Sequence, residues 1–285
     1  MHDEARTLYS AASVVLMQER LVAGLNTMHD DSCRRNFLLD AGRNLEGISR
    51  WLCDAGLDEQ VNASYAPTFL HGGSSAGKWV IMGINPGADD QPHEHTFKRA
   101  SPENYLHFHE QFFLHFPRLR RNERQPWWSK LYRVTRVLEG IVAEAGAVPW
   151  SELDRCSTFV VQDLLPFHGR TNGTLKSLES GALGTIANAT IEGVSRSAAR
   201  GVLVFSPDGY KLFDRHPRVH ITRRFELAGQ SSKGSPRRIR GYVARIAKIP
   251  LVALNNQFIS QPWFPYNAAL PLLLAELRRE GLVES

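Results

Sequence analysis

Four short apolar runs, each bounded by polar or turn-forming residues, constrain the fold of this chain more than any other feature. They lie at 78–84 (KWVIMGI), 157–164 (STFVVQDL), 200–206 (RGVLVFS) and 249–256 (IPLVALNN). Runs of this kind are typical of parallel strands that helices cover on both faces. Helical segments lie between the runs, and this alternation predicts an α/β fold with right-handed crossovers.

The expected architecture is a three-layer sandwich with a central, mostly parallel four-stranded sheet and an N-terminal helical extension. Apolar residues recur at helical spacing within residues 1–60, so we expect the extension at 1–70 and the α/β domain at 71–285. Further helices are expected over 127–145 and 268–282. Two alternating segments, 219–227 and 238–246, flank a Gly- and Ser-rich loop and predict a β-hairpin with a basic tip.

Composition excludes several classes of protein. An apolar fraction of 42% argues against a disordered or fibrous chain. No segment approaches the ~20 apolar residues of a membrane span, and the first residues lack the features of a secretory signal, so we expect a cytoplasmic protein. The three cysteines, Cys33, Cys53 and Cys156, are too few and too dispersed for a disulfide framework or an iron–sulfur cluster.

Histidine pairs raise the question of a metal. His93/His95 and His107/His109 have a spacing that binds zinc on a strand, but the other ligands of a zinc nucleobase deaminase are absent. We therefore expect neither metal nor cofactor, and interpret these histidines as pocket lining or DNA contacts.

The net charge of +5 is concentrated in two basic stretches, 115–136 and 233–248. Such stretches are often no more than solvated faces, but two of them favour binding to phosphates. The candidate DNA-binding residues are Lys233, Arg237, Arg238 and Arg240.

Residues 72–79 (GGSSAGKW) nearly match a phosphate-binding loop. That loop needs a hydroxyl where Trp79 stands and a helix where a strand is expected. A flexible loop before the first strand is the favoured interpretation, and an NTPase is the alternative.

The first apolar run ends in Gly83-Ile84-Asn85-Pro86-Gly87. This motif resembles the first active-site motif of the uracil-DNA glycosylase superfamily, especially its mismatch-specific thymine/uracil branch. Segments 125–134, 159–167, 201–213 and 254–260 follow in the family's order, so the resemblance covers roughly residues 75–283. It implies a uracil-DNA glycosylase-like fold and an enzyme that flips a base out of DNA and hydrolyses its N-glycosidic bond.

The resemblance also implies roles for single residues. Asn85 would position the attacking water, and because Asn accepts a proton less readily than Asp, Asp89 is a candidate for assisting it. Asn256 would contact the base carbonyl, although the Pro and Ser that normally follow are Gln257 and Phe258 here. The remaining base-pocket candidates are Gly83, Ile84, Pro86, Gly87, a stacking Phe97 and a wedging Phe258. An ordinary turn at 85–87 and a core position for Phe97 are the alternatives.

Asp163 stands where the family usually has Asn, which suggests a different base. A carboxyl accepts from the N4 amine of cytosine and, when burial keeps it protonated, donates to N3. Alternatively, Asp163 caps a turn, or the aligned residue is Gln162.

Because plain cytosine is part of the cell's own DNA, the expected substrate is hydroxymethylated or glucosylated cytosine in phage DNA, and the role is antiviral defence. His168, in the donor-rich segment 167–172, would bind the 5-substituent. Alternatives are a uracil or mismatched-thymine repair glycosylase and a non-catalytic nucleic-acid binder with the same fold. The expected partner is DNA, as duplex or single strand.

Overall fold

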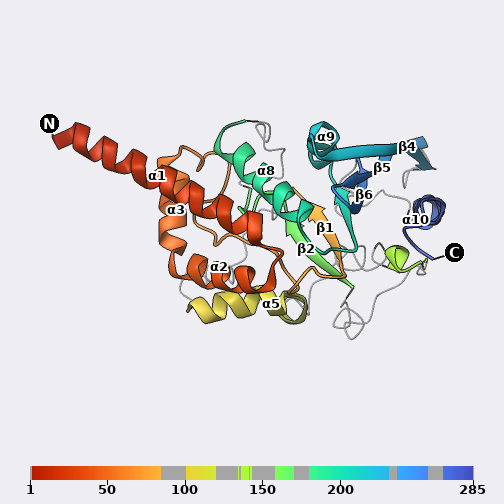
Figure 1. The fold of residues 1–285 in the computed structure, drawn as a ribbon, viewed down its shortest axis with the longest axis horizontal. Helices are drawn as coiled ribbons and strands as arrows, with labels where there is room; N and C mark the ends of the chain where they lie inside the picture. The colour runs from red at the N-terminus through yellow and green to blue at the C-terminus, as the bar shows by residue number, and fades with distance from the viewer. Residues whose placement is uncertain are drawn as a thin grey trace. The chain divides into compact units, whose positions relative to one another are not determined.

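The computed structural model describes residues 2–84, 101–119, 134, 136–140, 142, 158–169, 180–230, 236–255 and 266–284. The chain forms two compact units that interleave along the sequence (Figure 1). The first unit comprises Met1–Ser74, Gly83–Gln111 and Gln162–Ser197, and the second comprises Ser75–Met82, Phe112–Val161 and Ala198–Ser285. The expected boundary near residue 70 stays a prediction.

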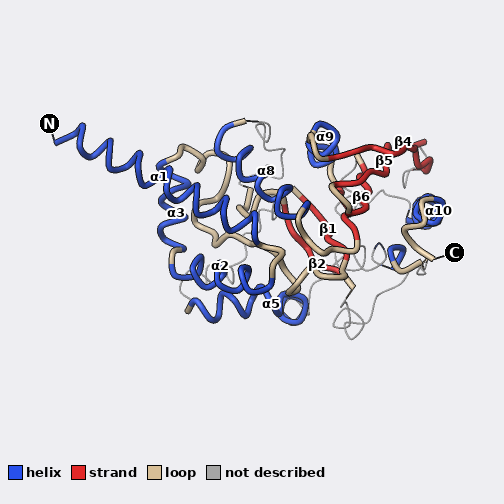
Figure 2. Tube along the Cα trace, in the orientation of Figure 1, coloured by secondary structure: helices blue, strands red, loops and turns tan. Residues whose placement is uncertain are grey.

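Six strands form one sheet in the order β2-β1-β3-β6-β5-β4 (Figure 2). Their bounds are β1 (Trp79–Gly83), β2 (Phe159–Asp163), β3 (Gly201–Phe205), β4 (Val219–Gln230), β5 (Pro236–Ile246) and β6 (Ile249–Leu254). The four predicted strands and the predicted hairpin are all present, and the mostly parallel α/β class is confirmed. The predicted strand count of four is wrong, because β5 pairs with β6 as well as with β4 and so joins the hairpin to the sheet.

The four predicted strands run in one direction. β1 pairs with β3 and β3 with β6 in parallel, with Met82 opposite Val204 and Phe205 opposite Leu254. β2 runs alongside β1 in the same sense, because the Trp79 N–H donates to the Thr158 carbonyl and the Leu164 N–H donates to the Gly83 carbonyl. The carboxyl ends of these strands therefore lie at one edge of the sheet.

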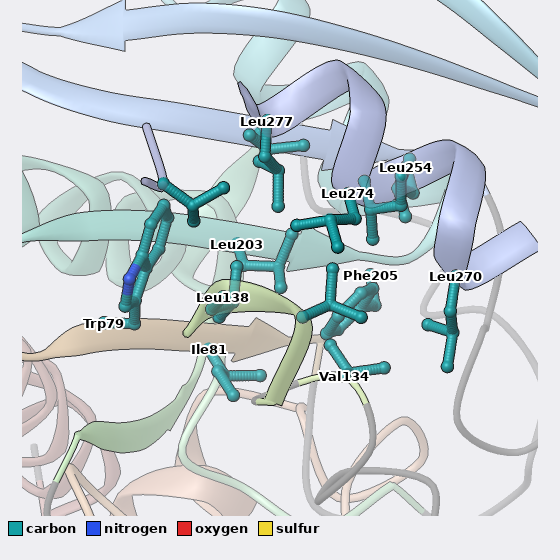
Figure 3. Packing of buried hydrophobic residues seen from close by; sticks show 14 of the residues in the cluster. Trp79, Ile81, Val134, Leu138, Leu203, Phe205, Leu254, Leu270, Leu274 and Leu277 are labelled. Atoms are coloured by element: carbon teal, nitrogen blue, oxygen red, sulfur yellow. The ribbon is translucent and has the colours of Figure 1, made fainter. Parts of the chain in front are cut away.

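An apolar core covers one face of the sheet in the second unit (Figure 3). Alternate strand residues such as Ile81 and Leu203 meet the last helix, α10 (Tyr266–Arg279), which contributes Leu270, Leu273, Leu274 and Leu277. Burying side chains of this size stabilises the fold by roughly 1.5–3 kcal/mol each. The predicted last helix is confirmed, with bounds two to three residues earlier than expected.

A second helix, α9 (Pro207–Arg215), packs on the opposite face. The Tyr210 ring lies 4.7 Å from the Tyr242 ring, and Tyr242 points away from the core side because its neighbour Val243 belongs to that core. The helix begins where the Ser206 hydroxyl accepts from the Gly209 N–H at 2.8 Å, followed by a proline in the first turn. Helices thus cover both faces of the sheet in the second unit.

The first unit is built from helices. They are α1 (His2–Thr27), α2 (Asp31–Arg43), α3 (Leu45–Asp54), the start of α5 (Pro102–Leu119) and α8 (Gly181–Ser195). α1 packs along α8 (Figure 1) so closely that a Cβ on Gly193 would overlap the Leu25 carbonyl. The predicted helical character of the first 60 residues is confirmed. Among the described residues, no helix has both the length and the apolarity of a membrane span.

Candidate functional site

A carboxyl group lies against a glycine where β1 and β2 end. Asp163 is the last residue of β2 and Gly83 the last residue of β1. The two strands are neighbours, and alternation of side chains puts both positions on the same face. A Cβ on Gly83 would overlap Oδ1 of Asp163, so only glycine allows the carboxyl to lie across the end of β1.

The backbone around Asp163 is held by three hydrogen bonds. The Leu164 N–H donates to the Gly83 carbonyl at 3.2 Å, and the Leu165 N–H donates to the Ile84 carbonyl at 2.7 Å. From α8, the buried Thr190 hydroxyl donates to the Leu164 carbonyl at 3.0 Å. These bonds fix the direction of the chain on the carboxyl side of Asp163 and therefore the direction in which its side chain points.

The Asp163 carboxyl is held in a poorly solvated place. It keeps some exposed area at the strand end, but protein atoms crowd around it, and desolvation raises its pKa from 3.8 to about 7. Among the described residues, no N–H or hydroxyl donates a hydrogen bond to this carboxyl. A poorly solvated acid without a donor is costly for a fold, and such groups concentrate at functional sites.

Gln162 points to the other face of β2. It is buried in the first unit beside His29, whose pKa burial lowers to about 4. Asp163, and not Gln162, therefore contacts the residue that begins the GINPG motif. Ile84, the second residue of that motif, is buried.

His168 lies inside the first unit. Its ring is 5.3 Å from the Tyr65 ring, and its carbonyl accepts from the Asn62 N–H at 2.7 Å. Burial lowers the pKa of the neighbouring His71, and the charge that His168 would carry when protonated lowers it further. The predicted contact of His168 with a base substituent stays a prediction.

His107 and His109 do not have the geometry that zinc binding on a strand requires. They lie on helix α5, where His107 is exposed and His109 is buried. Nδ1 of His109 donates to the Tyr105 carbonyl at 2.9 Å and Nε2 accepts from the Phe69 N–H at 3.0 Å. The described part of the chain contains no cluster of three or more potential metal ligands.

The near-match to a phosphate-binding loop is a loop that leads into a strand, as expected. Gly72, Gly73 and Gly77 adopt positive φ angles, and β1 begins at Trp79, directly after Lys78. The helix N-terminus that a nucleotide phosphate would need at this point is replaced by a strand.

The hairpin arginines divide into two groups. On β5, Arg238 and Arg240 are exposed, and Arg238 makes a 3.3 Å ion pair with Glu226 across the hairpin. On β4, Arg223 binds Glu276 of α10 and Glu280, the residue after the end of α10. The backbone of Arg237 belongs to β5.

The remaining predicted site residues lie outside the described residues and stay predictions. They are Asn85, Pro86, Gly87, Asp89, Phe97, Lys233, Asn256 and Phe258. His93 and His95 also lie there.

Sequence reasoning missed Thr190. This residue lies on helix α8 between Ala189 and Ile191 and is fully buried. A hydroxyl between two apolar neighbours was the available signal, because a buried hydroxyl needs a partner. The Ile186 carbonyl, at 3.2 Å in the same helix, is a local partner, whereas the Leu164 carbonyl is known only from the tertiary structure.

Comparisons with protein-family models, with curated proteins and with solved structures found no match to this chain.

Proposed function

We propose that the chain is a monofunctional DNA glycosylase that releases hydroxymethylated or glucosylated cytosine from phage DNA and leaves an abasic site. The observation that carries the proposal is the Asp163 carboxyl, which lies across Gly83 at the carboxyl end of two adjacent parallel strands. Ligands of open α/β sheets bind beyond this end of the strands. A uracil-DNA glycosylase-like, three-layer arrangement is part of the same proposal.

The chemistry of Asp163 fits the edge of cytosine. With a pKa of about 7, a large fraction of the carboxyl is protonated at neutral pH. The protonated acid accepts from the N4 amine through its carbonyl oxygen and donates from its hydroxyl to N3. Transfer of that proton to N3 neutralises the negative charge that develops on the base as the bond to C1′ breaks.

Asp163 then acts as the general acid, and the other roles come from the GINPG resemblance. Asn85 holds the water that attacks C1′, Asp89 assists removal of its proton, and Asn256 binds the base carbonyl. These residues follow the carboxyl ends of β1 and β6 in the sequence. Asp163 is the last residue of β2, and the proposal therefore draws its groups from the carboxyl ends of three strands.

The base assignment is tested with duplexes that each carry one candidate base: uracil, mismatched thymine, cytosine, 5-hydroxymethylcytosine or its glucoside. Alkaline cleavage of the strand reports an abasic site. We expect cleavage with a modified cytosine, and a loss of about 10²-fold or more in Asp163→Asn, since general acid catalysis contributes that much. Cleavage with uracil or thymine alone would identify a repair glycosylase and contradict the base assignment.

Asn85→Ala separates the enzyme from a non-catalytic binder. We expect this variant to lose base release while it still binds the same duplex. If wild-type protein binds DNA but releases none of the five bases, the chain is a binder and the proposed reaction is wrong.

A further inference from the structure

The positive charge of the chain is concentrated around the β4–β5 hairpin. Residues 207–250 contain eleven Lys and Arg against three Asp and Glu, a net +8, whereas the whole chain carries +5. The rest of the protein is therefore slightly acidic. The two strands that extend the sheet beyond its four predicted strands are also its basic part.

Two arginines of this segment are engaged in structural contacts. Arg223 binds Glu276 of α10 and Glu280, the residue after the end of α10. Arg224 donates to Asp214 of α9 at 2.6 Å, and its guanidinium lies 5.7 Å from the centre of the Tyr242 ring. Both side chains attach β4 to a helix, so neither is the natural contact for a partner.

The outer half of the hairpin extends past the end of its neighbour β6. β6 pairs only with residues 241–246 of β5, and Gly241 lies opposite Leu254, the last residue of β6. Residues 236–240 of β5 pair with residues 226–230 of β4. Among the described residues that follow β6, only Asn255 bonds to this part of β5, through its N–H to the Arg240 carbonyl. Five residue pairs at about 3.3 Å per residue project about 17 Å past β6.

This projection lies at the carboxyl edge of the sheet. β6 runs parallel to β3 and β3 to β1, so the end of β6 that the hairpin passes is the end at which β1 and β3 also finish. The proposed reaction uses this edge.

The two faces of the projecting half differ. Leu227 and Ile239 point into the apolar core beneath α10. Arg238 and Arg240 alternate with Ile239 and are exposed on the other face, about 7 Å apart along the strand. Glu226 of β4 lies opposite Arg240 in the strand register and makes an ion pair with Arg238.

We infer that the projecting half of the β4–β5 hairpin is a docking ribbon for the phosphate backbone of duplex DNA, contacted by Arg238 and Arg240. A two-stranded ribbon has the width of the major groove, and the guanidinium fork binds phosphate oxygens in pairs. The choice of DNA as the partner rests on the proposed function, whereas the charge and the projection are properties of the hairpin itself.

The test compares charge reversals at the two ends of β5. The variant Arg238→Glu/Arg240→Glu changes the projecting half, and the matched control Arg245→Glu/Lys248→Glu changes exposed cations at the opposite end of β5. Binding to an unmodified duplex is measured by fluorescence anisotropy at several salt concentrations. We expect the first variant to lose about tenfold or more in affinity and its salt dependence to be shallower by about two phosphates.

The control variant should bind within about twofold of wild type if the contact is local. Glu226→Gln should bind more tightly than wild type, because it removes the acidic group of the ribbon. Equal losses in both double variants would overturn the inference in favour of a bulk charge effect, as would unchanged binding in Arg238→Glu/Arg240→Glu. The neutral variant Arg238→Gln/Arg240→Gln serves if the reversal prevents folding.

Base release is measured separately, so the two proposals fail independently. If the ribbon variants lose DNA binding and wild type releases no base, the docking inference stands and the glycosylase proposal fails. If the ribbon variants bind DNA and release base like wild type, the glycosylase proposal stands and the docking inference fails. Wild-type binding to anionic vesicles without binding to DNA would overturn the docking inference.

Discussion

The carboxyl of Asp163 occupies the space that a side chain on Gly83 would need. The two residues are 80 positions apart and meet because β1 and β2 are neighbours that run in the same direction. The first residue of the GINPG motif must therefore be a glycine if the carboxyl of Asp163, on the neighbouring strand, is to keep its position. The position of the Asp163 carboxyl across the end of β1 therefore requires that residue 83 has no side chain.

Gly83→Ala should move the Asp163 carboxyl out toward water. Overpacking of this kind costs about 1–3 kcal/mol, and with better solvation the pKa of Asp163 should fall from about 7 toward 3.8. The pKa is measured by a ¹³C carboxyl NMR titration, with Asp163→Asn to assign the signal. Gly47→Ala is the control, because its Cβ would meet only the flexible end of Met17. An unchanged pKa in Gly83→Ala would mean that the glycine does not position the carboxyl.

Thr190→Val should loosen the chain at Leu164 without changing the volume of the side chain. It removes the 3.0 Å bond to the Leu164 carbonyl, at a cost of about 1–3 kcal/mol for a buried acceptor. Thr190→Ser keeps the hydroxyl and should retain the base-release rate, whereas Thr190→Val should lower it and shift the midpoint of its pH profile. Equal pH profiles in the two variants would limit Thr190 to a role in stability.

Base release should decline as pH rises above about 7. The reaction needs the protonated form of Asp163, which is dominant below its pKa of about 7 and is lost above it. The rate should therefore be constant on the acidic side and fall about tenfold per pH unit on the basic side. Single-turnover rates between pH 5.5 and pH 9 give the profile. A rate that instead increases with pH would show that the ionised carboxyl is the active form.

Acid should destabilise the first unit through its buried histidines. The His109 ring is stacked on the His71 ring at 5.0 Å, and burial lowers the pKa of His109 from 6.5 to about 4. The unfolded chain therefore binds more protons than the native one between pH 6.5 and 4, so stability is full above pH 6.5 and falls as pH decreases through this window.

Unfolding by urea at pH 7 and pH 4.5 tests this effect of pH. In His109→Gln, an amide replaces the ring between the Phe69 N–H and the Tyr105 carbonyl, so the loss of stability on acidification should be smaller than in wild type. His107→Gln, on the exposed side of the same helix, should behave like wild type. If the two variants respond to acid alike, His109 is not the titrating group.

The strands were predictable because apolar runs such as 79–83 and 201–205 carry their own signal of burial on both faces. The hairpin was also predictable, because apolar and polar residues alternate in 219–227 and 238–246. Its addition to the sheet was not, because it depends on the turn at Ala247 and on the pairing of β5 with β6, and neither has a local pattern. The spacing of His107 and His109 would suit zinc binding only on a strand, and the surrounding residues form a helix, in which His107 is exposed and His109 is buried.

The candidate site was predictable only in part. Asp163 was identified from its place after the second strand, and Gly83 from the GINPG motif. Their contact could not be derived, since it requires the order of the strands and a carboxyl that leans across its neighbour. The bond from Thr190 required the same three-dimensional information.

Strand β4 ends the strand order, and in the described part of the chain no further strand pairs with it. An outer edge of twelve residues is a template on which a second chain could polymerise. Arg223 and Arg224 lie midway along this edge, and two β4 edges meeting in antiparallel fashion would bring their like charges together. We therefore expect the arginines that attach β4 to its helices also to disfavour pairing between two β4 edges.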